Sequence, residues 1–389
     1  MHYMEIGGAE RALLGLLNAI DTNKVDVDLF INQHTGEFMK LIPNKINLLP
    51  EISAYSIIEK PIITALKKGH IGIAFARILA KIHYTIPKRY GKTGDDYSIF
   101  YYVAKYTTPL LPSLKKYGEY DLAISFLSPH NVVKDKVLAK KKIAWIHTDY
   151  TKISIDASAE LEVWDSYDKI ISISEDVTKT FTQVFPSLKD KIIGIENILS
   201  PQFIKDQSSL FEPEEMRGDF VKICSIGRFC FAKNFENIPF IAQKLKEQGL
   251  NFKWFIIGFG DTTETIENIR RTNTDVCVKL LGKKENPYPY IANCDIYVQP
   301  SRYEGKSVTV REAQILCKPV VITNYPTASS QVIDEKDGLI CNMDNDSIAN
   351  TIYNLSQDKN KQTEIEKYLS SHDYGNENEV NKIYQLINE

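Results

Sequence analysis

The chain has 389 residues, a length that accommodates two or three domains of ordinary size. Hydrophobic residues make up 43% of it and charged residues 25%, which excludes a disordered tail protein, a collagen and a coiled coil. The formal net charge is −3, so a dedicated nucleic-acid-binding protein, which is usually strongly basic, is disfavoured.

The six cysteines all lie in the carboxyl-terminal half, and no two of them form a C-x-x-C pair. Several stand in apolar stretches where buried thiols are expected, so the pattern favours neither a zinc site nor a disulfide framework. Free thiols without a secretory signal indicate the cytoplasm. Because no stretch reaches 18 consecutive apolar residues, we expect no membrane-spanning helix.

Two glycines near the start of the chain, Gly7 and Gly8, are followed by a helical pattern from about Ala9 to Ile20. Two glycines before a helix form either an anion-binding loop or a simple turn. A Rossmann unit normally has a strand ahead of its glycine loop, and almost no room for one exists here. If the natural start lies upstream of Met1, we expect a short apolar strand of roughly five to seven residues there.

The rest of the first half alternates strands with helical patterns, interrupted by a helical insertion at about 52–114. The predicted strands are Val25–Ile31, Asp121–Phe126, Lys142–His147, Lys169–Ser174 and Lys191–Glu196. Ser200–Asp219 is polar, contains two prolines and suits a linker. The predicted domains are therefore 1–199 and 200–373, with a C-terminal helix at about 374–389 that packs back on the first.

The second half has the same rhythm, with apolar runs that suit strands buried on both faces. These predicted strands are Val221–Ile226, Phe252–Ile257, Val276–Leu281, Asp295–Gln299 and Pro319–Thr323. Between them lie helical segments such as Phe235–Gln248, which Gly249 closes. We predict an α/β fold of two Rossmann-like, doubly wound parallel-sheet domains facing a central cleft. Ligands bind such sheets beyond the carboxyl ends of the strands, so chemistry is sought there.

The strongest local signal follows the predicted strand that ends near Pro300. Gly305 would let the backbone approach a ligand, and Ser307 would cap the next helix. The amides around Lys306–Thr309, those of Ser307 and Val308 among them, would then point at an anion.

Two carboxylates, Glu304 and Glu312, border the same helix start. Carboxylates are badly placed for phosphate but well placed for the hydroxyl groups of a sugar or ribose. The alternative is an exposed loop glutamate and a solvated helix glutamate.

A second signal, Gly227–Asn234, follows the strand Val221–Ile226. Arg228 could supply a bidentate fork and Lys233 a point charge to a diphosphate. Two solvated cations on a surface loop are the alternative. Gly258 and Gly260 form only a bare G-x-G, which is better explained by a tight packed turn than by nucleotide binding.

His147 ends a first-domain strand, where it could reach a substrate or be a hydrogen-bonded core histidine. Two D-x-D patterns, at Asp26–Asp28 and at Asp344–Asp346, lie away from the cationic loops. We therefore expect no metal site and no metal cofactor.

These features together resemble a known family. The opening glycine pair, the Arg228 and Lys233 pair, and the E-x7-E spacing of Glu304 and Glu312 are similar to the retaining glycosyltransferases of family 4. That family has the two-domain GT-B architecture. The wording around the second glutamate resembles members that build bacterial capsule, exopolysaccharide or O-antigen.

The resemblance implies roles for individual residues. The residue matching Glu304 contacts the donor sugar, and the one matching Glu312 binds the nucleotide ribose. Those matching Arg228 and Lys233 bind the diphosphate, and the histidine matching His147 lies by the transferred sugar. The implied activity is metal-independent transfer from a UDP- or GDP-sugar to a glycan or lipid-linked glycan, with retention of the anomeric configuration.

Two other functions stay open at this point. One is a non-catalytic sugar-nucleotide-binding or scaffold protein of the same fold. The other is a dinucleotide-dependent oxidoreductase, although the complete dinucleotide fingerprint is missing.

The predicted insertion carries eight basic and no acidic residues between Lys60 and Lys92. Isoleucine, leucine and phenylalanine residues are interleaved at spacings that suit amphipathic helices. Segment 60–92 could lie peripherally on an anionic membrane surface, or its apolar face could be ordinary core.

Overall fold

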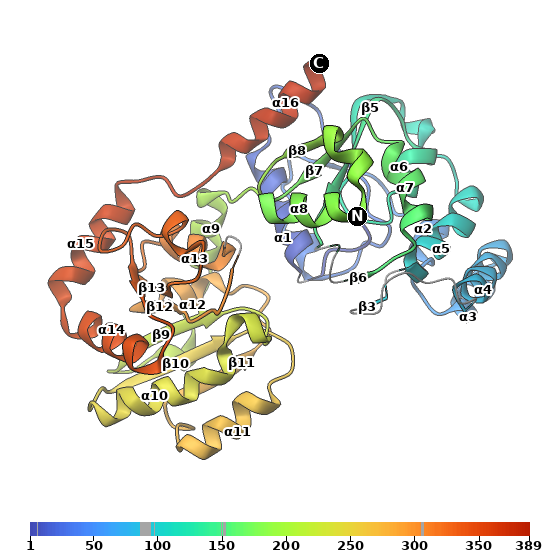
Figure 1. The fold of residues 1–389 in the computed structure, drawn as a ribbon. Coiled ribbons are helices and arrows are strands. Elements are labelled where there is room, and N and C mark those ends of the chain that lie inside the picture. The colour runs from blue at the N-terminus through green and yellow to red at the C-terminus, as the bar shows by residue number, and fades with distance from the viewer. Residues whose placement is uncertain (6, 86–94, 97, 149, 151–152, 305–306) are drawn as a thin grey trace. The chain divides into compact units, whose positions relative to one another are not determined.

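The computed structural model describes the chain apart from residues 6, 86–94, 97, 149, 151–152 and 305–306. The chain forms two compact units, whose elements are labelled in Figure 1. Unit 1 comprises Met1–Ile198 and Asn376–Glu389, and unit 2 comprises Leu199–Gly375. Both units are α/β structures built on parallel strands.

Unit 1 is organised by a four-stranded parallel sheet in the order β4-β5-β7-β8. Its strands are β4 (Glu119–Ser125), β5 (Leu138–Ile146), β7 (Lys169–Ser172) and β8 (Ile192–Gly194). Two short parallel pairs accompany it, β1 (Asp28–Leu29) with β2 (Asn47–Leu48) and β3 (Asp95–Asp96) with β6 (Ile153–Ser154). Ile143, Ile170 and Ile171 are fully buried, which explains the continuous apolar runs of the central strands.

Unit 1 also contains α-helices. They are α1 (Gly8–Ala19), α2 (Ser53–Ser56), α3 (Ile62–Lys67), α4 (Ile71–Thr85), α5 (Ser98–Thr107), α6 (Asn131–Lys136), α7 (Ala157–Asp165), α8 (Glu175–Val184) and α16 (Val380–Asn388). The insertion predicted at about 52–114 therefore contains α2 to α5, with α4 packed on α5. Within the described residues, no helix is both long and apolar enough to cross a bilayer.

The strand predicted at Val25–Ile31 is shorter than expected. Beyond β1, the backbone pairs with the first residues of the chain: the Met1 α-amino group donates to Phe30 O at 3.1 Å, and Asn32 N donates to Met1 O at 2.9 Å. This segment and β4, an edge strand of the four-stranded sheet, both line a largely apolar cavity of about 250 Å³.

The last residues of the chain belong to unit 1. Tyr384 Oη on α16 accepts a hydrogen bond from Asp21 N at 2.8 Å, and Lys141 Nζ donates to Leu386 O at 2.8 Å. The apolar residues Val380, Ile383 and Leu386 of α16 are buried.

Unit 2 contains a six-stranded parallel sheet in the order β11-β10-β9-β12-β13-β14. Its strands are β9 (Val221–Ile226), β10 (Phe252–Ile257), β11 (Val278–Gly282), β12 (Ile296–Gln299), β13 (Val320–Thr323) and β14 (Leu339–Cys341). Its helices are α9 (Pro201–Ser208), α10 (Ile238–Glu247), α11 (Thr263–Thr272), α12 (Tyr288–Ala292), α13 (Val308–Ile315), α14 (Asn345–Gln357) and α15 (Lys359–Ser370). The chain therefore reverses its progression across the sheet between β9 and β12, which is the switch point where ligands bind doubly wound sheets.

The linker prediction for Ser200–Asp219 is wrong. Ser200 caps α9 by accepting a hydrogen bond from Phe203 N at 3.4 Å, and Pro201 occupies the first helical turn, where it lacks only a donor that would be unpaired anyway. Ile204 and Met216 are buried in the core of unit 2. Two prolines in a polar stretch here mark a helix start and a turn rather than a linker.

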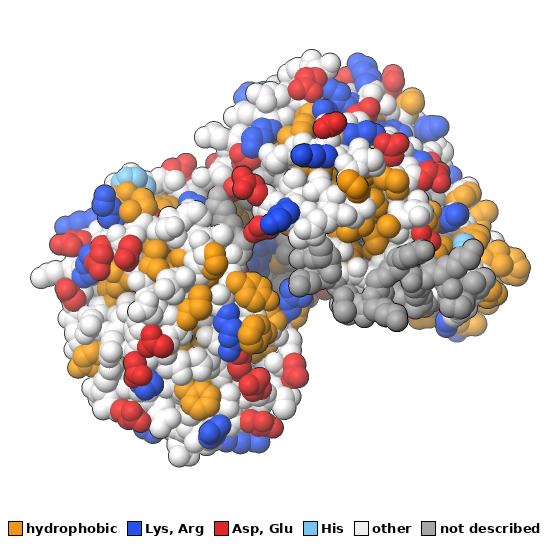
Figure 2. Space-filling model, in the orientation of Figure 1, with side chains coloured by type: hydrophobic (Ala, Val, Ile, Leu, Met, Phe, Trp, Pro, Cys, Tyr) orange, Lys and Arg blue, Asp and Glu red, His pale blue; other side chains and the backbone are white. Residues whose placement is uncertain are grey.

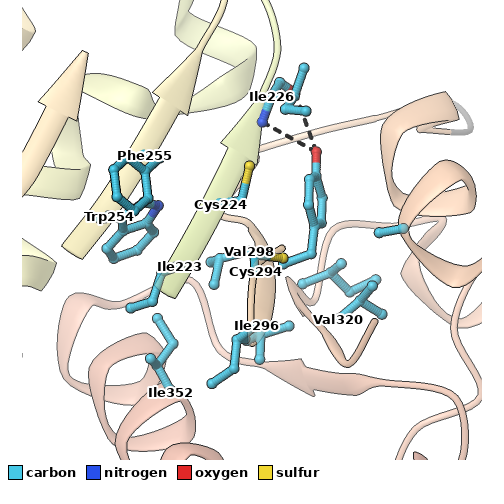
Figure 3. Close-up of a cluster of buried hydrophobic side chains, with 14 of the residues drawn as sticks. Ile223, Cys224, Ile226, Trp254, Phe255, Cys294, Ile296, Val298, Val320 and Ile352 are labelled. Atoms are coloured by element: carbon cyan, nitrogen blue, oxygen red, sulfur yellow. Dashed lines mark hydrogen bonds between the residues drawn. The ribbon is translucent and has the colours of Figure 1, made fainter. Parts of the chain in front are cut away.

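The core of unit 2 lies around β9, β10 and β12 (Figure 3). Ile223, Cys224, Trp254 and Val298 point into it, and the sulfur of Cys224 behaves as a small apolar group. Such packing fixes the strand ends, and hence the loops that follow them, to one geometry.

Candidate functional site

Two loops of unit 2 are joined at the carboxyl ends of the neighbouring strands β9 and β12. Asn234 Nδ2 donates to Pro300 O at 3.0 Å, and Arg302 N donates to Ala232 O at 2.8 Å. Asn234 adopts a left-handed conformation (φ 59°), which asparagine tolerates better than most residues. The predicted cationic loop and the predicted carboxylate loop therefore form one rigid edge.

Lys233 and Glu304 meet at this edge. Lys233 Nζ lies 2.5 Å from Glu304 Oε1, and their side chains are only 20% and 11% exposed. Ser301 Oγ donates to the same carboxylate oxygen at 2.6 Å, while Thr327 Oγ1 donates to Glu304 O at 2.8 Å. The sequence predicts that both residues lie at one site, but it does not predict their direct ion pair.

A buried hydrogen-bond chain supports Ser301 from below. Gln299 Nε2 donates to Ser301 Oγ at 3.0 Å, and Gln299 Oε1 accepts from Tyr297 Oη at 3.0 Å. Thr309 Oγ1 on α13 lies 3.3 Å from the same amide oxygen. Because Ser301 accepts from Gln299, its proton is directed at Glu304. Sequence reasoning missed these residues; polar side chains at the end of an otherwise apolar strand were the available signal.

The start of α13 differs in part from expectation. Ser307 is the residue that precedes the helix, but its side chain makes no capping hydrogen bond and lies 3.2 Å from Thr309 Oγ1. Its amide donates to Gln331 Oε1 at 3.0 Å and so is occupied by the protein itself. Val308 is the first helical residue. Gly305 and Lys306 lie outside the described residues.

Glu312 is fully buried on α13, so the alternative of a solvated helix glutamate is wrong. Tyr288 Oη donates to Glu312 Oε1 at 3.0 Å, which offsets part of the penalty of burying the carboxyl group. No role was predicted for this tyrosine from the sequence.

The remaining cations on this edge differ in their surroundings. Arg228 is exposed on the loop after β9. Arg302, which received no predicted role, donates to Phe231 O at 2.6 Å and pairs with Glu236 Oε1 at 2.5 Å. Through these contacts Arg302 stabilises the loop that follows β9.

The prediction that Gly258 and Gly260 serve packing is confirmed. A Cβ atom on Gly258 would lie 1.8 Å from Gly227 O, an impossible approach. Gly260 has a φ of 126°, which disfavours any side chain, and its backbone pairs with Phe229.

The predicted residues of unit 1 occupy the ends of β5 and the start of α1. Burial lowers the pKa of His147 to about 4, so the ring is neutral, and its Nε2 is buried without a hydrogen-bond partner. Gly7 precedes α1 and Gly8 begins it. A Cβ on Gly7 would lie 2.0 Å from Glu10 Oε2, so a carboxylate lies against the predicted anion loop and disfavours an anion there.

The two D-x-D patterns have structural contacts. Asp28 accepts hydrogen bonds from Asn47 Nδ2 at 2.6 Å and Tyr120 Oη at 2.5 Å. Asp344 caps α14 by accepting from Ser347 N at 2.8 Å, and Asp346 pairs with Lys244.

The sequence family described as "Glycosyl transferases group 1" matches residues 206–371, within unit 2. Among curated proteins, the chain is 27% identical over 180 residues to an uncharacterized glycosyltransferase of Methanocaldococcus jannaschii, covering 46% of each. It is 22% identical over 171 residues to the amylovoran biosynthesis glycosyltransferase AmsD of Erwinia amylovora, covering 43% of this chain and 48% of that protein. The chain thus spans about half the length of these relatives.

A third curated relative is the N-acetylgalactosamine-N,N'-diacetylbacillosaminyl-diphospho-undecaprenol 4-alpha-N-acetylgalactosaminyltransferase of Campylobacter jejuni. The identity is 30% over 127 residues, covering 32% of this chain and 34% of that protein.

Solved structures match the whole chain. Anabaena HepE in complex with UDP and glucose covers 100% of this chain, with 98% of its own length matched, a TM-score of 0.60 and 13% identity. A glycosyltransferase from Rickettsia africae covers 99%, with 96% of its own length matched, at the same TM-score and identity. At these identities the likeness concerns the fold, and the fold is GT-B. The chain therefore has the GT-B fold, and its residues 206–371 in unit 2 match the glycosyl transferases group 1 family.

Proposed function

We propose that this protein transfers a sugar, with retention of anomeric configuration and without a metal ion, from a UDP- or GDP-sugar to a growing, lipid-linked surface polysaccharide. The observation that carries the proposal is the contact of Lys233, Glu304 and Ser301 at the switch point of unit 2. The match of that unit to a glycosyltransferase domain supports it.

The chemistry follows from the charges. A departing nucleoside diphosphate develops negative charge, which Lys233 and the exposed Arg228 would stabilise. Glu304 would release Lys233 to the diphosphate and accept a hydrogen bond from a sugar hydroxyl instead. The partial positive charge at the start of α13 near Val308 would add to this stabilisation. The buried Glu312 would accept from the ribose hydroxyls if Tyr288 turns aside.

The neutral ring of His147 suits hydrogen bonding to the transferred sugar rather than to a phosphate. The names of the Campylobacter and Erwinia relatives, one acting on a diphospho-undecaprenol and one in amylovoran biosynthesis, favour a lipid-linked polysaccharide acceptor.

The test begins with thermal unfolding of the full chain in a panel of UDP- and GDP-sugars and NAD. A donor at 100 times its dissociation constant should add about 2.7 kcal/mol of stability. The enzyme should also hydrolyse that donor slowly. NMR spectra recorded before the released sugar mutarotates should show the same anomeric configuration as in the donor, which is the result expected for retention. Binding without hydrolysis or transfer would favour the scaffold alternative, and stabilisation by NAD alone would favour an oxidoreductase.

The acceptor's lipid implies contact with a membrane, and one surface of unit 1 is suited to it. Large apolar side chains project from α3 and α4 (Figure 2): Ile63, Leu66, Ile71, Phe75, Ile78, Leu79 and Ile82 are all exposed. Lys67, Lys68 and Lys81 are exposed beside them. We call these ten residues the α3–α4 face. The alternative that this apolar face is core is therefore wrong for these seven side chains, while Ile73, Ala74 and Ala80 form the buried side.

One of the eight basic residues between Lys60 and Lys92 has another role. Arg77 donates to the backbone oxygens of Ile57 and Lys60, so it holds the end of α2 rather than facing outward. Lys88, Arg89 and Lys92 lie outside the described residues.

Sedimentation with vesicles tests this contact. Binding should require anionic lipid, because each exposed lysine near the surface contributes about 1 kcal/mol. Replacing Lys67, Lys68 and Lys81 by glutamine should weaken it, and so should Phe75→Ser with Ile78→Ser. The same change at Lys179 and Lys189, exposed lysines elsewhere on unit 1, is the control. Equal binding to neutral vesicles, or none to anionic ones, would remove the membrane from the proposal.

A further inference from the structure

Unit 1 contains a cavity of about 370 Å³ that the donor chemistry does not use. This volume lies within the range of small-molecule sites. It opens between the loops that follow β4 and β5, and α5 and α7 supply further walls. Its described lining includes the aromatic side chains of Tyr3, Phe100, Tyr101, Tyr150 and Trp164. Flat apolar rings with polar edges suit the faces of a sugar, which carry C–H groups, better than they suit a charged group.

A carboxyl group is fixed among these rings. Glu160 of α7 is hydrogen-bonded by Trp164 and Tyr150, and burial raises its pKa to about 7. Because both partners are packed in the core of unit 1, the carboxyl group has a set position in the cavity wall. A carboxyl group held this way has oxygens to accept hydrogen bonds from hydroxyls.

Two further polar atoms in the wall have no partner. His130 Nε2 and Asn131 Oδ1 are buried and make no hydrogen bond, and both residues are more than nine-tenths buried. The ring of His130 is neutral, because burial lowers its pKa to about 3, and its other nitrogen lies 2.8 Å from Ser125 Oγ. Both atoms are shielded from solvent, so they lie behind the surface of the cavity rather than on it.

The charges of the wall restrict the ligand that the cavity can bind. Among the described lining residues, the carboxyl groups are those of Glu59, which is paired with His2, and Glu160. The same described residues include no lysine or arginine. An anionic ligand would therefore meet repulsion from these two carboxyl groups, with no cation of the described lining to offset it.

We propose that this cavity binds one sugar ring of the acceptor glycan, and that this ring is uncharged, carrying no carboxylate, phosphate or sulfate. The inference rests on the proposed function, because only a glycosyltransferase needs an acceptor. It adds the location and the chemical class of the acceptor sugar. Phe100 and Tyr101 lie on α5, which packs on α4, so a ring held here belongs to the same unit as the α3–α4 face.

The test titrates the full chain with methyl glycosides of glucose, galactose, mannose and N-acetylglucosamine, and with methyl glucuronide and methyl galacturonide. Tryptophan fluorescence is the first readout, because Trp164 lines the cavity, and ligand-observed NMR is the second. We expect saturable binding of at least one uncharged glycoside, and binding of its uronide roughly tenfold weaker or worse. If no uncharged glycoside binds, or if the uronide binds as tightly as the uncharged glycoside, the inference is wrong.

Variants locate the binding. Glu160→Gln should lower the affinity for the uncharged glycoside and reduce the ratio of its affinity to that of the uronide. Tyr3→Ala should lower the affinity for both ligands. Glu162→Gln, on the same helix but exposed, should change neither. Unaltered binding in both Glu160→Gln and Tyr3→Ala would place the sugar elsewhere. If a nucleotide sugar stabilises the chain but no glycoside binds, only the assignment of the cavity is refuted. If a glycoside binds but no nucleotide sugar stabilises the chain, the proposed transferase function is refuted.

Discussion

Replacing Lys233 by methionine separates the chemical role of this residue from its structural one. The substitution keeps most of the aliphatic stem and removes the ammonium group that lies 2.5 Å from Glu304 Oε1. Ser301 Oγ still donates to the same oxygen, so the carboxylate is not left without a hydrogen bond.

The expected loss of stability follows from the exposure of the pair. Breaking a fully buried ion pair costs about 3–5 kcal/mol, whereas an exposed pair contributes about 1 kcal/mol or less. With both side chains largely but not fully buried, we expect a loss of about 1–3 kcal/mol. A domain stable by about 5–15 kcal/mol would then remain folded in nearly all molecules at 25 °C. Turnover should fall by about 100- to 1,000-fold, because one charge contact to the transition state is lost.

Urea unfolding followed by tryptophan fluorescence measures the first quantity, since Trp254 is buried in the core of unit 2. Donor hydrolysis or transfer at saturating nucleotide sugar measures the second. Lys244→Met is the matched control, because Lys244 also forms a 2.5 Å ion pair in unit 2, with Asp346, but lies away from the joined loops. A double-mutant cycle with Glu304→Gln gives the coupling of the site pair.

The reasoning is refuted if Lys233→Met turns over like the wild type. It is equally refuted if its activity falls only in proportion to the unfolded fraction, or if Lys244→Met loses as much turnover.

Four further results are expected. Calorimetry with the sugar-free nucleoside diphosphate should show weaker binding for Glu312→Gln and unchanged binding for Glu304→Gln; equal losses would contradict their separate roles. Turnover should survive EDTA, and complete loss restored by Mn²⁺ or Mg²⁺ would overturn the metal-independent proposal. In thermal unfolding, Gly258→Ala should lose about 1–3 kcal/mol or more, because its Cβ would collide with Gly227 O, whereas Gly194→Ala, with nothing within 4 Å, should lose much less. The pKa of Glu160 rises from 4.5 to about 7 on folding, so the contribution of this one group to stability should fall by up to about 3 kcal/mol as pH rises from 4.5 to 7. His130 and His147, whose pKa values burial lowers, contribute with the opposite sign, so the difference between the urea titrations of the wild type and Glu160→Gln measures the Glu160 contribution.

The sequence predicted those parts of the fold that depend on local pattern. The strands Val221–Ile226 and Phe252–Ile257 were predicted with their observed bounds, because strands buried on both faces leave uninterrupted apolar runs. The strand Val25–Ile31 was predicted too long, since the backbone partner of its second half is the chain's own first residues. Pairing between distant segments leaves little trace in a single sequence.

The same distinction holds within the candidate site. The loops bearing Lys233 and Glu304 follow predicted strands, so their shared location could be inferred from topology. Their ion pair could not, because it depends on the hydrogen bonds of Asn234 and Arg302 that join loops about 70 residues apart. Local pattern thus determines which edge of the sheet carries a residue, and tertiary contacts determine what it touches.

The cavity of unit 1 shows where motif reasoning stops altogether. Glu160 has no distinctive neighbours in sequence, and its helix is only weakly amphipathic. What makes its carboxyl group unusual is its burial with Trp164 and Tyr150, which is a property of packing alone. Donor sites in such proteins bind a shared chemical group, the nucleoside diphosphate, and so use similar residues at similar spacings. Acceptors differ in chemistry from one protein to the next, so the residues that select them need no common motif. For the proposed transferase, the acceptor preference must therefore be read from the charges and rings of the cavity wall, which predict that an uncharged sugar binds roughly tenfold more tightly than its uronic acid, or better.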